Sequence, residues 1–91
     1  MMPTWNESKR ESNLRDHGLD FVGCETIFDG PVVVLEDDRE RYGEQRLNVI
    51  GWLGSVVIHT TYTERKNDSH VISLREAEKH EIKRFIKEIT R

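Results

Sequence analysis

The sequence predicts an α+β fold in which two N-terminal helices precede a four-stranded antiparallel sheet and an amphipathic helix closes the chain. Three observations support this class. Before residue 31, short apolar segments are bounded by helix-capping residues and by glycine or proline, and from residue 32 to 73 the chain has runs of β-branched or alternating apolar and polar residues. Near the end, apolar residues recur at helical spacing. Since 91 residues suffice for one domain and not for two, we expect a single domain over residues 1–91.

Two short helices are expected first. Asn6 is a good N-cap for a polar helix that Gly18 ends, because glycine readily adopts the left-handed conformation after a last turn. Asp20 is the expected cap of the second helix, which stops at Asp29-Gly30-Pro31. Its apolar face is formed by Phe21, Cys24, Ile27 and Phe28.

Four strands are expected at 32–35, 45–53, 55–64 and 70–73. A charged loop, residues 36–43, separates the first two, and the later connections are short turns. Short connections between sequential strands favour an antiparallel meander, since parallel pairing needs long crossovers.

The last helix is expected to begin at a capping box, Ser73-Leu-Arg-Glu76. After the capping box, apolar residues recur at helical spacing and predict one buried face of the helix. These residues are Ile82, Phe85, Ile86 and Ile89.

Composition narrows the function classes. The net charge of −3 disfavours a protein whose whole surface binds nucleic acid, although a local basic cleft is compatible with it. The single cysteine, Cys24, excludes an internal disulfide and is expected to be a buried, inert thiol. With no apolar stretch of the ~20 residues that span a bilayer and no signal-peptide pattern, we expect a cytoplasmic protein.

Several kinds of site are disfavoured. No glycine-rich phosphate loop follows a strand, and the four histidines lack metal-ligand spacing, so neither a nucleotide cofactor nor a metal is expected. What remains is a scattered polar set for which surface exposure or local ion pairing is the plain interpretation of each member. Its members are Lys9, Asn13 and His17 on one helix face, Glu44 and Arg46 at a strand start, and His59, His70 and Arg75 further on.

These positions also carry a resemblance to a known family. The motifs are Trp5-Asn-Glu-Ser-Lys9, Asn13 with His17-Gly18, Glu44-x-Arg46, and Ile72-Ser-Leu-Arg75 followed by Ala77 and Glu81. In this order they resemble the BrnT family, ribonuclease toxins of bacterial type II toxin–antitoxin pairs, from Trp5 to about Ile86. The resemblance implies a RelE-like fold. Where the family commonly has an arginine, this chain has His70.

The mechanism that the resemblance implies is metal-free RNA cleavage with the 2′-hydroxyl as nucleophile, which needs a base, an acid and cations at the phosphate. We expect Arg46 and Arg75 to stabilise the phosphate, since the guanidinium fork matches two oxygens. His17 is the expected proton-transfer group, and Glu44 is either a base or the residue that orients an arginine. Lys9, His59 and His70 are second choices, as RNA contacts.

The resemblance also implies a partner, the BrnA antitoxin, which has a DNA-binding ribbon–helix–helix part. A 2:2 assembly that reaches operator DNA only through the antitoxin is expected, with an apolar docking surface around Trp52 or Val33. Two alternatives remain open at this point: a non-catalytic module of the same fold kept for antitoxin binding, and an RNA-binding domain that does not cleave.

Overall fold

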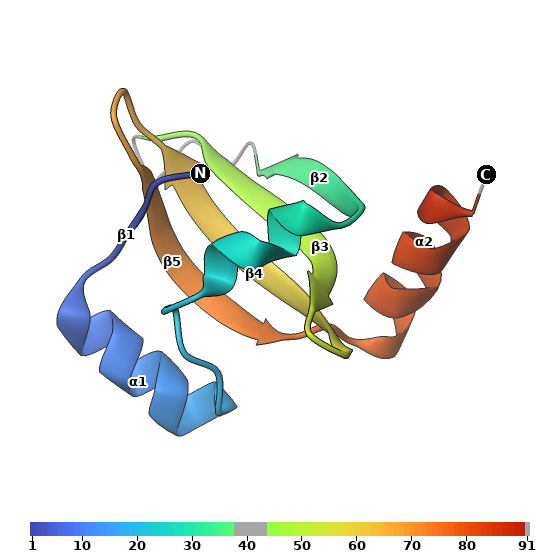
Figure 1. Cartoon of the computed structure of the whole chain (residues 1–91), viewed down its shortest axis with the longest axis horizontal. Helices are drawn as coiled ribbons and strands as arrows, with labels where there is room; N and C mark the ends of the chain where they lie inside the picture. Colours follow the sequence, from blue (N-terminus) through green and yellow to red (C-terminus); the bar gives the residue numbers. More distant parts are fainter. Residues whose placement is uncertain (38–43, 91) are drawn as a thin grey trace.

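The computed structural model describes residues 1–37 and 44–90. The elements in chain order are β1 (Pro3–Thr4), α1 (Glu7–His17), the 3-10 helix η1 (Cys24–Asp29), β2 (Val32–Asp37), β3 (Arg46–Leu53), β4 (Val56–Glu64), β5 (Ser69–Glu76) and α2 (Lys79–Ile89). In Figure 1, η1 crosses in front of the sheet, α1 lies beside β5, and α2 lies at the opposite side. The predicted α+β class is confirmed, and the RelE-like likeness stays a prediction.

The sheet has five strands in the order β1-β5-β4-β3-β2. The four long strands form the predicted antiparallel meander. The prediction of a four-stranded, wholly antiparallel sheet is wrong, however, because β1 adds to the edge in parallel and pairs Pro3 with Ser69 and Thr4 with His70. Two residues are too few to show an alternating pattern, so the sequence carries no signal for this strand.

The first predicted helix is confirmed. The Asn6 side chain accepts a hydrogen bond from the Lys9 backbone N–H at 3.2 Å, and Gly18 ends α1 in the left-handed conformation. The second predicted helix is wrong in type and start, since η1 begins only at Cys24, after Gly23 at φ +88°. Only six residues fit between Gly23 and Gly30, and the apolar spacing of three residues (Phe21, Cys24, Ile27) matches the 3.0-residue turn of a 3-10 helix.

The last strand is longer than predicted, and the capping box at Ser73 is wrong. Ser73 to Glu76 remain in β5, and the capping box that starts α2 is formed by Glu78 and Glu81. The register pairs Thr61 with Ser73 but Tyr62 with Val71, so Ile72 is the extra residue of a bulge. The predicted charged loop lies largely outside the described residues; Glu36 and Asp37 belong to β2.

Each face of the sheet has its own apolar cluster. The face under η1 buries Phe21, Cys24 and Ile27 against Val49, Ile58, Tyr62, Val71 and Leu74. Gly51 allows the close approach of η1, since a Cβ there would lie 2.8 Å from Ile27 Cγ1. Cys24 is buried as predicted, and burial raises the pKa of its thiol to about 11. The opposite face buries Ile50, Val57 and Phe85 under α2.

Asn13 joins α1 to the edge of β5 where β1 has ended. Its side-chain amide donates to the Leu74 carbonyl oxygen at 2.8 Å and to the Leu19 carbonyl oxygen at 3.0 Å. Its side-chain oxygen accepts from the Leu74 backbone N–H at 3.1 Å. The carboxamide thus takes the place of a neighbouring strand, and it is buried with 7% of its surface exposed. This residue of the predicted polar set is therefore structural.

We expect Asn13→Ala to lower the free energy of unfolding by about 2–3 kcal/mol, because it leaves three backbone groups without their partner. Urea unfolding followed by circular dichroism measures the change. Glu11→Ala, an exposed change on the same helix, serves as the control and should stay within about 0.5 kcal/mol of the parent chain. An equal effect of both changes would contradict the structural role.

Candidate functional site

The face of the sheet that carries α2 is apolar at one end and polar over the rest. The apolar part lies under Phe85, which also meets Trp52 edge-on with ring centroids 6.1 Å apart. Beyond it, rows of paired residues on the same face are polar in β3, β4 and β5. We call this surface the polar face; its residues are Arg46, Asn48, His59, Thr61, Thr63, His70, Ser73 and Arg75.

The best-defined cluster on the polar face is built around the Glu81 carboxylate, at the start of α2. Arg75 Nη1 donates to Glu81 Oε1 at 2.8 Å, and Arg75 Nη2 donates to Oε2 at 3.0 Å. The Glu78 backbone N–H donates to the same carboxylate at 2.8 Å as part of the capping box. A bidentate pair of this kind fixes both the position and the plane of the guanidinium.

His59 lies next to this pair, because the register of β4 and β5 places it directly opposite Arg75. Its Nε2 is 3.7 Å from Glu81 Oε2, beyond hydrogen-bond length, and its side chain is 13% exposed. Nδ1 is buried and has no hydrogen-bond partner among the described residues. An unsatisfied ring nitrogen beside an arginine is unusual and marks a candidate for chemistry rather than for packing.

The charges of the cluster follow from these contacts. The hydrogen bonds from Arg75 lower the pKa of Glu81 from 4.5 to about 2, and they raise the pKa of Arg75 in turn. Burial, and next the positive charge of Arg75, lower the pKa of His59 below its usual 6.5, although the Glu81 carboxylate opposes this. At neutral pH the site therefore holds an ion pair and a neutral imidazole, which is able to accept a proton.

Arg46 shares the polar face but not the cluster. It pairs with Thr63, four residues along β4 from His59, and it belongs to β3 whereas Arg75 belongs to β5. Strand geometry places the two arginine backbones roughly 13 Å apart along the strands and roughly 10 Å apart across them. The two predicted phosphate contacts thus face the same side of the sheet at separate places.

The remaining predicted strand residues have partners of their own. Glu44 precedes β3, and its carboxylate accepts hydrogen bonds from Arg65 Nε at 3.3 Å and Nη2 at 3.4 Å, in an exposed pair. His70 Nδ1 lies 3.2 Å from the Thr4 hydroxyl, which also bonds to Asp68. His70 therefore lies at the edge where β1 joins the sheet, in the row of Arg46 and away from Arg75.

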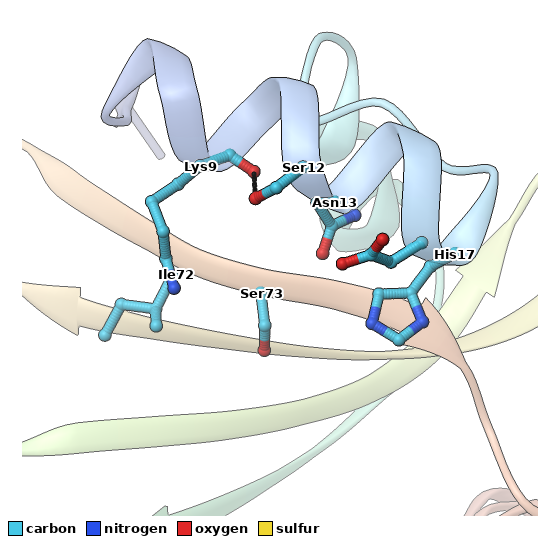
Figure 2. Close-up of a pocket in the computed structure, with 7 residues that line it drawn as sticks. Lys9, Ser12, Asn13, His17, Ile72 and Ser73 are labelled. Carbon is cyan, nitrogen blue, oxygen red and sulfur yellow. Dashed lines mark hydrogen bonds between the residues drawn. The ribbon is translucent and has the colours of Figure 1, made fainter.

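The predicted helical face of Lys9, Asn13 and His17 lies over a groove between α1 and β5 (Figure 2). The groove has a volume of about 140 Å³ and is also lined by Ser12, Asp16, Ile72 and Ser73. Figure 2 shows the side chains of α1 directed toward β5, with the His17 ring beside the strand. Ser73 belongs both to this groove and to the polar face, so the two surfaces meet at β5.

Within residues 1–37 and 44–90, no three His, Cys, Asp or Glu side chains are grouped so that they could hold a metal ion. In the same part of the chain, no helix has the length and apolar character needed to cross a bilayer.

Residues 5–81 match the model of the family described as "Ribonuclease toxin, BrnT, of type II toxin-antitoxin system". The chain belongs to this family. The match covers most of the chain and confirms the resemblance found from the motifs. Among curated proteins, no significant match is found. A BrnT-family chain is a ribonuclease toxin by this description, and membership of a type II system implies a protein antitoxin.

Within this BrnT-family toxin, the residue that the sequence-based site prediction missed is Glu81. It stands six positions after Arg75, across a strand–helix junction, so no single periodicity relates the two side chains. The only available signal was its place after Ile72-Ser-Leu-Arg75 in the family motif. The acidic pair Glu78 and Glu81, three residues apart, is also a weaker capping signal than Ser73 with Glu76.

The lowered pKa of Glu81 predicts acid sensitivity. An unfolded chain binds a proton at this carboxyl near pH 4.5, whereas the folded chain does so only near pH 2, so this contribution to stability is complete above 4.5 and is lost as the pH falls toward 2. Urea unfolding between these pH values should show a smaller stability loss for Glu81→Gln than for the parent chain. Glu25→Gln, an exposed carboxyl, should behave like the parent. Parallel curves for all three would contradict the assignment.

Proposed function

We propose that this chain is a metal-independent endoribonuclease that cleaves RNA on the polar face, with Arg75 at the reacting phosphate. The observation that supports this most directly is the cluster of Arg75, Glu81 and His59. It places a fixed guanidinium beside a neutral imidazole on one face of the sheet. Cleavage through the 2′-hydroxyl needs only a proton acceptor, a cation for the phosphate charge and a proton donor.

Each predicted residue then has a role in the proposal. Arg75 stabilises the charge that builds on the phosphate, and His59 accepts the 2′-hydroxyl proton as a neutral base. His17, in the groove that adjoins the polar face at Ser73, is the candidate for returning a proton to the 5′-oxygen. Arg46 contacts a different phosphate of the same strand, since its backbone lies far from Arg75.

The other predicted residues have secondary roles in the proposal. His70, in the same row as Arg46 but two strands away, and Lys9, in the groove, contact RNA on either side of the cleaved bond. Glu44 orients Arg65, which is the second of its two predicted roles. No metal takes part in the proposed reaction.

The proposed regulation is neutralisation by a ribbon–helix–helix antitoxin of the BrnA type in a 2:2 complex that binds operator DNA through the antitoxin. The family description supports a protein antitoxin. Trp52 has 38% of its surface exposed and remains a candidate contact, whereas Val33 packs against the cluster of Ile50, Val57 and Phe85 and offers less surface.

Purified chain incubated with RNA in EDTA tests the activity. We expect cleavage that leaves 2′,3′-cyclic phosphate ends, no cleavage of DNA, and a loss of roughly 10²–10³-fold in kcat/KM for Arg75→Ala. Arg84→Ala removes the same charge from an exposed position on α2 and should cleave normally. Bound but intact RNA would favour the RNA-binding alternative. Neither binding nor cleavage would favour a module kept for the antitoxin.

The proposed base predicts a particular pH profile. Because the neutral form of His59 is the active form and its pKa lies below 6.5, kcat/KM should fall as the pH is lowered below that value. His59→Gln should lower the rate and remove this decrease at acid pH. The rates are measured at saturating and at low RNA concentrations. His80→Gln, at an exposed histidine on α2, should keep the decrease. An unchanged decrease in His59→Gln would assign proton transfer elsewhere.

A further inference from the structure

We propose that Glu81 is a positioning residue: it holds Arg75 by one edge of the guanidinium so that the other edge is presented to the phosphate of RNA. This inference rests on the proposed function and goes beyond it, because it assigns a role to a residue that does not itself touch the substrate.

The donors of Arg75 are divided between two edges. A guanidinium carries five N–H groups, two on each Nη and one on Nε. The Nη1 group donates to Glu81 Oε1 at 2.8 Å and to the Glu76 carbonyl oxygen at 3.1 Å, and Nη2 donates to Glu81 Oε2 at 3.0 Å. Those three hydrogen bonds use three of the four N–H groups on Nη1 and Nη2, at the end of the guanidinium.

Two donors are left over, the Nε–H and the second N–H of Nη2. They lie side by side on the lateral edge, and no described residue accepts a hydrogen bond from either. The Arg75 side chain is 30% exposed, and the proposal requires that its exposed part include this edge. Two parallel N–H groups match two oxygens of a phosphate as well as they match a carboxylate.

Glu81 is itself held in place, which it must be to position another group. Its carboxylate accepts the Glu78 backbone N–H at 2.8 Å, and its side chain is only 14% exposed. Its neighbours on α2, Ile82 and Phe85, pack on the sheet. The low pKa keeps the carboxylate charged throughout the neutral range, so the clamp on Arg75 does not depend on pH there.

A paired carboxylate has two opposite effects on an arginine that must bind phosphate. It cancels part of the positive charge, which weakens attraction, and it removes rotamer freedom, which favours binding and correct alignment. Because Glu81 occupies the end of the fork and leaves the lateral edge open, alignment is the larger effect. Removing the carboxylate should therefore slow cleavage.

A double-mutant cycle in RNA cleavage tests this. Glu81→Gln keeps the size of the side chain but turns one acceptor into a donor that faces Nη2, and we expect a loss of roughly 10–100-fold, mostly in kcat. In the Arg75→Ala background the same change should have no further effect, because the residue it positions is absent. Glu25→Gln, the same chemical change at an exposed carboxyl on η1, is the control and should cleave normally.

A second readout separates positioning from simple stability. Replacing one non-bridging oxygen of the scissile phosphate by sulfur should slow cleavage by the parent chain for one stereoisomer. Glu81→Gln should reduce that preference, while Glu25→Gln keeps it. All variants are assayed at a temperature where circular dichroism shows them folded.

The outcomes are distinct. Additive losses in the cycle, an unchanged sulfur preference, or faster cleavage by Glu81→Gln would each overturn the positioning role while the parent chain still cleaves. A parent chain that leaves RNA intact would overturn the proposed function, and the inference with it.

Discussion

The fold and the candidate site depend on one carboxylate. Glu81 accepts hydrogen bonds from Arg75 at the end of β5 and from the Glu78 backbone N–H at the start of α2, so it ties the last strand to the last helix. This connection fixes where α2 leaves the sheet, and Phe85 then packs on Ile50 and Val57. Because the same carboxylate orients Arg75, the geometry of the site is set by the packing of the helix.

The polar face is left uncovered because α2 packs on only part of this side of the sheet. The helix packs on β2 and β3 and covers only one end of this side of the sheet. On the opposite side, η1 and its flanking residues bury a larger apolar cluster, so stability does not require the second face to be apolar throughout. The bulge at Ile72 belongs to the same arrangement: it lets Val71 and Leu74 both face the η1 side, while Ser73 and Arg75 face the other.

What could be predicted from sequence followed local rules. Asn6, Gly18 and the alternating strands gave the order of the elements, because caps and alternation act over a few residues. The same rules failed at β5. Val71 and Leu74 are three residues apart and face the same side of the sheet only because of the bulge. This spacing resembles that of a helix and stands next to an apparent capping box at Ser73. A bulge is defined by the pairing with the partner strand, so no local pattern reveals it.

The sequence offered most residues of the polar face as candidates, but it missed Glu81 and could not predict how the residues are grouped. Arg46, His59, His70 and Arg75 do share one face, as alternation allows, yet the register separates Arg46 and His70 from the cluster. Asn13 follows the same helical spacing as Lys9 and His17, but its carboxamide is engaged with the backbone of Leu74. Distinguishing such a structural amide from a functional one requires knowledge of the neighbouring strand edge, which is tertiary information.

The acidic balance of the chain is compatible with an RNA substrate for a physical reason. Charges interact through water over about 8–10 Å at physiological salt, so a phosphate responds to the groups near it rather than to the net charge of −3. Several acids are also engaged with cations: Glu7 and Asp20 with Arg10, and Glu44 with Arg65. At the cluster, Glu81 offsets the charge of Arg75 and fixes its direction. In the proposed function, recognition at this site would depend on the alignment of a few N–H groups more than on a broad positive field, unlike binding of nucleic acid through a basic surface.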